Sequence, residues 1–368
     1  MTTARGVLAN PAANGRSAEC ADSAPVSRFH GSLPDYQPTP LVSAPSLAER
    51  LGVGSVHVKD ESNRLAMPSF KILGASWATF RVLCDVFGAD PDVVADLDGL
   101  RRLVADSELT LVAATDGNHG RALARMAGLL GLDAQILVPQ DMVAARIQAI
   151  EDEGAEVVVV PGTYDEAVSA SARLADDRHI VVSDTSWEGY RQVPGWVIDG
   201  YSTIVAEVSE QLAASGERAP TVVVVQIGVG AFASAMIRGF LPRGARIIGS
   251  EPTLAACVLE SVRAGRLARV GGRLDSSMAG LNCGTPSPIA WPEMRSGIST
   301  LVAVDDADAE EAMRALASVG VVSGESGAAG LAALLAFGPE LDLRADDRVL
   351  IISTEGATDP VAYAKIVG

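Results

Sequence analysis

One lysine stands out among the residues that can do chemistry. The chain has only three lysines, Lys59, Lys71 and Lys365, and arginine supplies its other positive charges. Lys71 lies in the run Ser-Phe-Lys-Ile-Leu-Gly-Ala, which is predicted to be helical and is otherwise apolar. An amine with apolar neighbours loses hydration, which lowers its pKa and makes it a usable nucleophile or base. The alternative is a lysine whose charged end reaches solvent past its apolar stem.

Polar residues are concentrated in a second run, Thr115-Asp116-Gly117-Asn118-His119-Gly120. The run follows a predicted strand and opens a predicted helix. Thr, Asp and Asn are common helix caps, so capping is the alternative interpretation. Asp116, Asn118 and His119, concentrated around two glycines, are more polar side chains than a cap requires, which favours a functional site.

A glycine turn follows a strand predicted to be buried on both faces and reads Gly228-Val229-Gly230-Ala231-Phe232. The N–H groups of such a turn, with the positive end of the following helix, bind phosphate without a basic side chain. The turn also fits the pattern G-x-G-x-x-A, and Glu251 stands 23 positions after Gly228. A dinucleotide site of a dehydrogenase therefore remains an alternative.

Ser353 ends another predicted strand and is followed by Thr354, Glu355 and Gly356. Sites in open α/β sheets lie at the carboxyl ends of strands, so this hydroxyl is a candidate ligand contact. A serine at such a place is also a common helix cap.

Two sets of predicted strands position these residues. Short β-branched runs alternate with helical stretches, a pattern typical of parallel α/β sheets. The first set is 111–114, 134–138, 156–160 and 179–182, and the second is 221–227, 246–250, 301–304 and 348–353, with 55–58 expected to join it. We predict a flexible tail over 1–27, a large cofactor-binding domain over 28–85 and 210–368, and a small inserted domain over 86–209.

Composition excludes several classes of function. The formal net charge of −17 argues against nucleic acid and against an anionic membrane surface as partners. No apolar run reaches the length of a membrane helix. The four cysteines and four histidines show no metal-ligand spacing, so we expect no metal. The scattered cysteines favour a reducing, cytoplasmic setting.

Taken in order, five motifs resemble those of the fold type II pyridoxal-phosphate (PLP) enzymes, the tryptophan synthase β-like group. They are Ser69-Phe70-Lys71, Thr115–Gly120, Gly228–Ala231, Ser323–Ala328 and Ser353–Gly356. Within this group the chain resembles the diaminopropionate ammonia-lyase family. The particular marks are Asp116 before Gly-Asn-His, the run Asp184–Tyr190, Met278–Leu281 with Cys283-Gly284, and Thr358-Asp359.

The resemblance implies two open parallel-sheet domains with PLP between them, and it implies a role for each motif. Lys71 would form the Schiff base, Asn118 would contact the phenolic oxygen, and Ser353 would face the pyridine nitrogen. Phe70 and the loop Gly228-Val229-Gly230-Ala231-Phe232 would complete the cofactor site, with the loop on the phosphate. The implied catalytic residues are Lys71, Asp116 and Asp184, and the implied substrate-binding residues are Thr115, Asp116, Asn118, His119 and Asp184.

The implied reaction is α,β-elimination on 2,3-diaminopropionate or a related β-substituted amino acid. An aminoacrylate would be released and would hydrolyse to pyruvate and ammonia. A homodimer is expected because the family forms one. The alternatives are β-replacement or serine/threonine-type dehydration, and a catalytically idle homologue. The chain departs from the family where Arg64-Leu65-Ala66-Met67 replaces Arg-Phe-Gly-Leu, and at Ala357.

Overall fold

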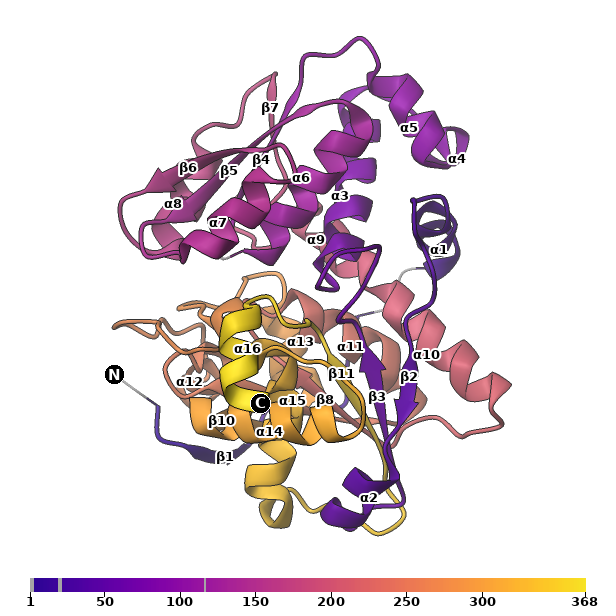
Figure 1. Ribbon diagram of the computed structural model, residues 1–368, viewed down its shortest axis with the longest axis vertical. Helices are drawn as coiled ribbons and strands as arrows, with labels where there is room; N and C mark the ends of the chain where they lie inside the picture. Colours follow the sequence, from indigo (N-terminus) through magenta and orange to yellow (C-terminus); the bar gives the residue numbers. More distant parts are fainter. Residues whose placement is uncertain (1–2, 19–21, 116) are drawn as a thin grey trace. The chain divides into compact units, whose positions relative to one another are not determined.

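A computed structural model describes residues 3–18, 22–115 and 117–368. The chain forms two compact units, each around its own sheet (Figure 1). The four-stranded unit comprises Ala21–Gln37 and Arg64–Thr203. The seven-stranded unit comprises Met1–Cys20, Pro38–Asn63 and Ile204–Gly368.

All strands of the four-stranded sheet run parallel, in the order β6-β5-β4-β7. Their bounds are β4 Thr110–Ala114, β5 Asp133–Pro139, β6 Glu156–Val160 and β7 His179–Val181. On one face Val112 and Leu137 pack with Ala167 of a covering helix. On the other face Ile136 approaches Gly120 so closely that a Cβ there would lie 2.6 Å from its Cγ2. The sheet is therefore covered on both sides, as parallel sheets are.

Helices of the four-stranded unit come before, between and after these strands (Figure 1). They are α1 Ser23–Gly31, α3 Lys71–Val86, α4 Pro91–Val94, α5 Leu97–Val104, α6 Asn118–Leu130, α7 Ala144–Glu151, α8 Tyr164–Ala172 and α9 Gln192–Gly200. Helix α6 and helix α8 are the two that pack on β4 and β5.

The seven-stranded sheet has the order β1-β10-β9-β8-β11-β3-β2. Its bounds are β1 Gly6–Ala9, β2 Leu41–Ser43, β3 Ser55–Asp60, β8 Val222–Gln226, β9 Arg246–Pro252, β10 Ile298–Val304 and β11 Arg348–Ser353. The two edge strands β1 and β2 are antiparallel to their neighbours, and the five inner strands are parallel. Every residue of β8 is buried, which explains its run of valines.

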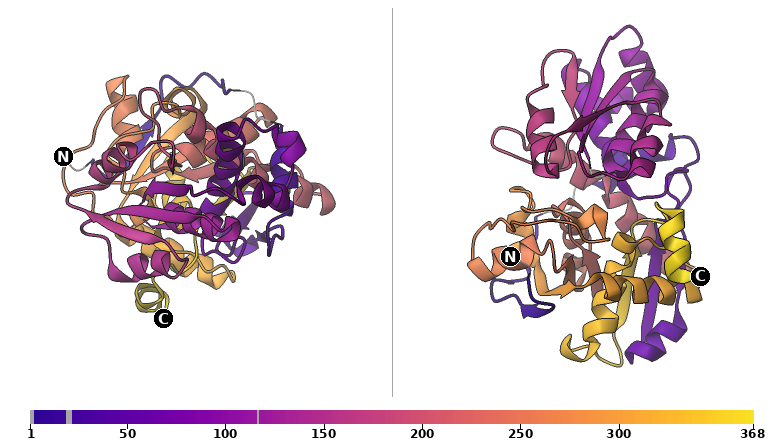
Figure 2. Two further views of the ribbon diagram at one scale, coloured as in Figure 1. Left: turned by 90° about the horizontal axis from the view of Figure 1, so that it is seen from above. Right: turned by 60° about the vertical axis from the view of Figure 1, so that its left-hand side comes forward.

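Helices cover both faces of this sheet as well, and Figure 2 gives two further views of these layers. Helix α15 packs on β8, where it shares a hydrophobic cluster with Val222 and Val224 of that strand. Helix α11 also contacts β8. The helices are α2 Pro45–Leu51, α10 Ser202–Ala214, α11 Ala231–Phe240, η1 Leu241–Arg243, α12 Cys257–Ala264, η2 Ala279–Leu281, α13 Trp291–Gly297, α14 Asp306–Ser318, α15 Glu325–Phe337, η3 Gly338–Glu340 and α16 Pro360–Val367. Helix α10 begins two residues before the division between the units.

Residues 3–18 and 22–27, the described part of the amino-terminal segment, correct the prediction of a flexible tail over 1–27. Strand β1 pairs residue by residue with the outer edge of β10, from Gly6 opposite Ala303 to Ala9 opposite Thr300. Helix α1 begins at Ser23, where the Asp22 side chain accepts a hydrogen bond from Ala24 N. An edge strand leaves a row of backbone donors and acceptors without partners. Strand β1 provides hydrogen-bond partners for this row on β10.

Helix α3 belongs to the four-stranded unit, whereas the sequence favoured its placement in the large domain. It packs on α6 and α9, so Lys71 at its first residue shares a unit with the run 115–120. The observed division at 203/204 also lies a few residues before the predicted one at 209/210. Packing of an apolar helix face decides this placement, and local sequence does not record it.

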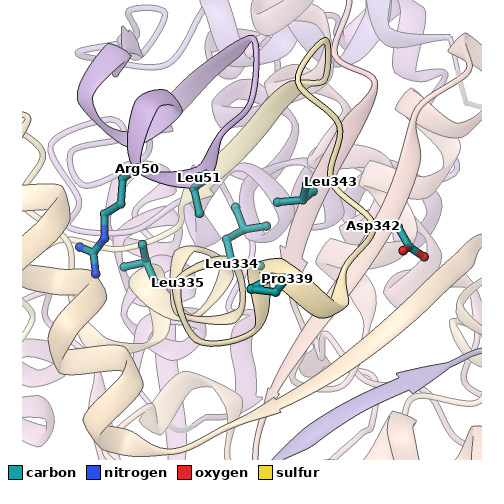
Figure 3. Close-up of a pocket in the computed structure, with 8 residues that line it drawn as sticks. Arg50, Leu51, Leu334, Leu335, Pro339, Asp342 and Leu343 are labelled. Carbon is teal, nitrogen blue, oxygen red and sulfur yellow. The ribbon is translucent and has the colours of Figure 1, made fainter.

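A cavity of about 540 Å³ lies in the seven-stranded unit, lined by residues of α2, α15, η3 and the segment that follows η3 (Figure 3). Leu51, Leu334 and Leu343 line it, and Arg50 lies at its side. None of the predicted site residues lines it, and sites in such sheets lie at the carboxyl edge. In the described ranges, none of the helices has the length and hydropathy needed to cross a membrane.

Candidate active site

The carboxyl edge of the four-stranded sheet brings several predicted site residues together. Thr115 directly follows β4, Asp184 follows β7 by three residues, and Tyr164 opens the helix after β6. Because these strands are parallel, all three segments end at one edge. We call the group Lys71, His119, Tyr164 and Asp184 the lysine cluster.

Lys71 donates a hydrogen bond from Nζ to Asp184 Oδ2 over 2.6 Å. The lysine side chain is 16% exposed and that of Asp184 is 5% exposed. The amine therefore does not reach solvent past its stem. It also does not lie among apolar groups alone, as its sequence neighbours indicated, because a residue 113 positions away supplies a carboxylate.

Asp184 is held in its ionised form. Burial alone would raise its pKa, but the charge of Lys71 outweighs burial, aided by hydrogen bonds from Lys71 and Tyr164. Together they lower the pKa of Asp184 to about 2. At neutral pH this carboxylate accepts hydrogen bonds and can pair with a cation. It has no proton to give, so it does not act as an acid.

Tyr164 hydroxyl donates to the second oxygen of Asp184, Oδ1, at 3.3 Å. Tyr164 is the first residue of α8, where a capping box between Thr163 and Glu166 fixes the start of the helix. The two oxygens of Asp184 thus have different partners, one cationic and one neutral.

His119 is buried and its ring orientation is fixed by the strand end. Nε2 lies 2.8 Å from the carbonyl oxygen of Val182. A carbonyl only accepts, so Nε2 carries a proton. Within the described part of the chain Nδ1 is buried and has no hydrogen-bond partner. In the neutral ring this atom has a lone pair, so it can accept a hydrogen bond from a ligand.

Thr115 serves the local backbone, as the capping interpretation predicts. Its Oγ1 accepts from the N–H groups of Gly117 and Gly120, each at 2.9 Å. A Cβ at Gly120 would lie 2.5 Å from Thr115 Cγ2, so the helix can approach only with glycine there. Asn118 is the first residue of α6, and Asp116 lies outside the described residues.

Phe70 and the turn before it position Lys71. The Phe70 ring packs against Tyr201, with centroids 4.7 Å apart, and lies under the lysine amine. Leu65 and Ala66 both have positive φ, 55° and 56°, in a tight turn closed between Arg64 and Met67. A left-handed backbone conformation costs a residue with a Cβ roughly 1–2 kcal/mol. This turn is therefore strained, because neither Leu65 nor Ala66 is a glycine.

Tyr190 holds the segment that carries Asp184. Its hydroxyl donates to Val181 O at 2.8 Å and accepts from Ser183 N at 3.0 Å. Its ring stacks on Trp187 with centroids 4.1 Å apart. Burial raises the pKa of Tyr190, so the hydroxyl keeps its proton and both bonds.

The glycine loop 228–232 lies at the carboxyl end of β8 and opens α11. Gly230 has φ of 102°, and a Cβ on it would lie 2.4 Å from Met294 Sδ. A Cβ on Gly228 would lie 3.0 Å from Gly280 O. Gly230 therefore has no room for a side chain, and Gly228 has little. The first N–H groups of a helix have no acceptor within it, which makes this end of α11 suited to an anion.

Ser353 ends β11 at the same edge, fully buried, with its Oγ 2.8 Å from Ser323 Oγ. Gln226, the last residue of β8, donates from Nε2 to Thr354 Oγ1 and to Ile352 O at 2.7 and 2.9 Å. These bonds fix the strand end on both sides of the serine.

Glu251 answers the dinucleotide alternative. Its two carboxylate oxygens accept from Val258 N and Leu259 N at the start of α12, both at 2.8 Å, and it is fully buried. A ribose-binding carboxylate must face its ligand, whereas this one caps a helix.

One residue of these clusters, Tyr164, escaped the sequence analysis, and it comes four residues after the end of β6. Ser323 was part of a motif, Ser323–Ala328, but the sequence analysis gave it no role of its own. Position after a strand end was the signal for Tyr164. In the described ranges no group of three or more metal-ligating side chains is assembled.

Sequence comparison identifies the class of protein that these features define. A family model for pyridoxal-phosphate dependent enzymes matches residues 33–355, and the chain belongs to that family. It is 36% identical to the diaminopropionate ammonia-lyase of Salmonella typhimurium, over 93% of this chain and 91% of that protein.

Solved structures agree. The chain matches an Escherichia coli diaminopropionate ammonia-lyase described as a complex with D-serine, at 33% identity and a TM-score of 0.91, over 100% of this chain and 97% of that one. A second structure of that enzyme, described as a complex with an aminoacrylate-PLP azomethine reaction intermediate, matches with a TM-score of 0.89 and 32% identity, over 100% and 98% of the two chains. The fold is therefore fold type II of the PLP enzymes.

The residues present fit PLP. The glycine loop leaves no room for a Cβ at Gly230 and presents a helix amino end, which suits the phosphate. Lys71 would offer an amine to the aldehyde, and Ser353 would offer a buried hydroxyl to the ring nitrogen. His119 Nδ1, buried without a hydrogen-bond partner in the described ranges, is an acceptor left for a ligand.

Proposed function

We propose that this protein is a PLP-dependent ammonia-lyase that eliminates the β-amino group of 2,3-diaminopropionate, or of a closely related β-substituted amino acid. The products are pyruvate and ammonia. One observation carries the choice of substrate: the ionised, buried Asp184 lies 2.6 Å from the Lys71 amine. A site that already holds one ammonium against a carboxylate suits a substrate with a cationic side chain.

The cofactor roles divide between the motifs. Lys71 is the residue joined covalently to PLP, and Phe70 lies beside it. Residues Gly228, Val229, Gly230, Ala231 and Phe232 hold the phosphate, Asn118 contacts the phenolic oxygen and Ser353 the ring nitrogen. PLP, when bound, supplies an electron sink that acidifies the Cα–H of the amino acid.

Two bases serve the two faces of the substrate. When its amine is not joined to the cofactor, Lys71 takes the Cα proton on one face. Asp116 takes it on the other, so both enantiomers can react. A positioned base of this kind contributes roughly 10²–10⁴-fold to the rate.

Asp184 acts on the leaving group. An ionised carboxylate favours the protonated form of a neighbouring amine. The β-nitrogen therefore stays an ammonium until the C–N bond breaks, and it departs as neutral ammonia. His119 Nδ1 accepts a hydrogen bond from the substrate, while Thr115 Oγ1 holds the backbone N–H groups of Gly117 and Gly120.

The hydroxyl at Ser353 selects elimination. A carboxylate at this place would keep a proton on the ring nitrogen, and the electron sink would be stronger. A neutral hydroxyl gives a milder sink, so loss of a β-substituent competes well against reprotonation. The same chemistry serves serine and threonine dehydration, which makes serine the comparison substrate.

The test is pyruvate release from D- and L-2,3-diaminopropionate and from D- and L-serine by the PLP-loaded protein. We expect turnover of at least one diaminopropionate enantiomer at a higher kcat/KM than serine, and its loss in Lys71→Ala. A protein that binds PLP but turns over only serine, or neither substrate, would overturn the proposal.

Asp116→Asn sharpens the assignment of the bases. The variant removes one proton acceptor and keeps the size of the side chain. We expect kcat to fall roughly 10²-fold or more for one enantiomer and far less for the other. Equal losses on both enantiomers would refute the two-face assignment.

We also propose a homodimer in a reducing, cytoplasmic setting. Support comes from the family resemblance for the dimer, and for the setting from cysteines that are scattered along the sequence, of which Cys84, Cys257 and Cys283 are buried. Light scattering coupled to size-exclusion chromatography tests the first, with a mass near twice 38.0 kDa expected.

A further inference from the structure

A pair of buried hydroxyls lies at the carboxyl edge of the seven-stranded sheet. Ser353 is the last residue of β11, and Ser323 lies just before α15. Their Oγ atoms are 2.8 Å apart, and both residues are fully buried. Each hydroxyl has one proton to donate, so one of the two donates and the other accepts.

Close packing fixes Ser323 at this distance. Gly324 N donates to Glu355 O at 3.0 Å, and Ser326 N donates to Glu355 Oε1 at 3.2 Å. These bonds join the two segments on either side of the hydroxyl pair. A Cβ on Gly327 would lie 2.7 Å from Ser323 Oγ, so glycine there makes room for the hydroxyl. The carboxylate of Glu355, the acidic residue nearest Ser353 in the sequence, is thus bonded to the start of α15.

The pair has two possible directions. In one, Ser353 donates to Ser323, and Ser323 donates to Gly324 O at 3.2 Å. That last contact is long for a hydroxyl bond, whose usual length is about 2.7–2.8 Å. In the other direction Ser323 donates to Ser353, and the single proton of Ser353 becomes available to an acceptor outside the pair.

We propose that Ser323 is a positioning residue that directs the Ser353 hydroxyl proton to the ring nitrogen of PLP. This inference rests on the proposed contact between Ser353 and that nitrogen. Ser323 donates its proton to Ser353 Oγ, and Ser353 donates to the nitrogen, so both protons stay on their oxygens. A hydroxyl that also accepts a hydrogen bond is a stronger donor, because neighbouring bonds polarise one another. The nitrogen is therefore hydrogen-bonded and unprotonated.

The experiment observes the nitrogen itself. PLP labelled with ¹⁵N in the ring is loaded into wild type, Ser323→Ala, Ser323→Thr and Ser353→Ala, and the ¹⁵N chemical shift and the Kd for PLP are measured. The matched control is Ser250→Ala, which removes another fully buried serine of the same unit whose Oγ donates to Ala329 O at 2.7 Å. Melting temperatures establish that each variant is folded.

We expect Ser323→Ala to move the ¹⁵N signal part of the way towards its position in Ser353→Ala. The Kd for PLP rises by roughly 2- to 10-fold, the effect of one lost hydrogen bond. Ser323→Thr keeps the hydroxyl and stays near wild type, as does Ser250→Ala.

Two outcomes overturn the inference and differ from each other. If Ser353→Ala moves the signal and Ser323→Ala leaves it at the wild-type position, Ser323 has no positioning role while the proposed Ser353 contact stands. If Ser353→Ala also leaves the signal unmoved with PLP bound, the proposed contact itself fails, and the inference fails with it.

Discussion

The lysine cluster and the glycine loop differ in the groups that they present, because the cluster presents charged side chains and the loop presents neutral backbone. The glycine loop of the seven-stranded unit has backbone N–H groups and two glycines but no charged side chain, with Gly230 at φ of 102°. The lysine cluster of the four-stranded unit uses charge, with an ion pair of 2.6 Å between two mostly buried groups. A phosphate carries its own charge and needs only donors, whereas proton transfer needs groups that change charge. Substitutions in the lysine cluster should therefore mainly lower the rate, and substitutions in the glycine loop should mainly weaken PLP binding.

The largest effect is expected from removing the charge of Asp184. Asp184→Asn keeps the shape but cannot hold an ammonium, so kcat/KM for 2,3-diaminopropionate falls by roughly 10²–10⁴-fold. Serine has a neutral hydroxyl in place of the ammonium, so its kcat/KM falls less. Steady-state pyruvate release on both substrates measures the difference.

The control for Asp184→Asn is Asp176→Asn, the same change at an exposed site in the same unit, with activity expected to stay at the wild-type level. A loss of equal size on both substrates would mean that Asp184 does not recognise the leaving amine.

A smaller effect is expected from filling the glycine loop. Gly230→Ala combines a positive φ with a Cβ 2.4 Å from Met294 Sδ, which together cost about 2–4 kcal/mol of unfolding free energy. The Kd for PLP should rise at least about tenfold because the loop must move. Urea unfolding and PLP titration measure the two quantities.

Gly244→Ala is the matched control for the loop, since Gly244 has φ of 88° and nothing within 4 Å of its Cβ position. It should cost only about 1 kcal/mol and leave PLP binding unchanged. If both variants behave alike, the space beside Gly230 is not what the loop requires.

The smallest effect concerns Glu251, next to the glycine loop in the sheet. Burial raises its pKa to about 8 against backbone N–H donors that lower it. The unfolded chain releases this proton near the ordinary value of 4.5, so the folded state holds one more proton between these pH values. Stability is therefore highest below that window and falls as pH rises through it.

Glu251→Gln removes the titration, so we expect the unfolding free energy of wild type to fall more steeply than that of the variant between pH 5 and pH 8. Urea midpoints across this range provide the measurement, and Glu217→Gln, at an exposed site, should follow wild type. Parallel curves for wild type and Glu251→Gln would show that the carboxyl is ionised throughout.

The order of elements was readable from the sequence. The parallel strands predicted at 111–114, 134–138 and 156–160 correspond to β4, β5 and β6. Each predicted end lies within one residue of the observed end. The predicted second set likewise forms the core of the seven-stranded sheet, and the strand at 55–58 joins it as β3. Runs of β-branched residues buried on both faces carry this information locally.

The sequence by itself predicted which motifs should bear chemistry. The glycine loop is legible because its constraint is local: a turn with positive φ and no room for a Cβ admits only glycine. The concentration of polar residues in the run 115–120 likewise led to the prediction of a functional site there.

Tertiary structure alone decided the electrostatics. The carboxylate that meets Lys71 lies 113 residues away, and Tyr164 reaches its other oxygen from a third strand end. The hydroxyl pair of Ser323 and Ser353 likewise joins segments 30 residues apart. Burial and pairing depend on which strand ends become neighbours, and the energies of charges and hydrogen bonds follow distance in space, not position in the chain.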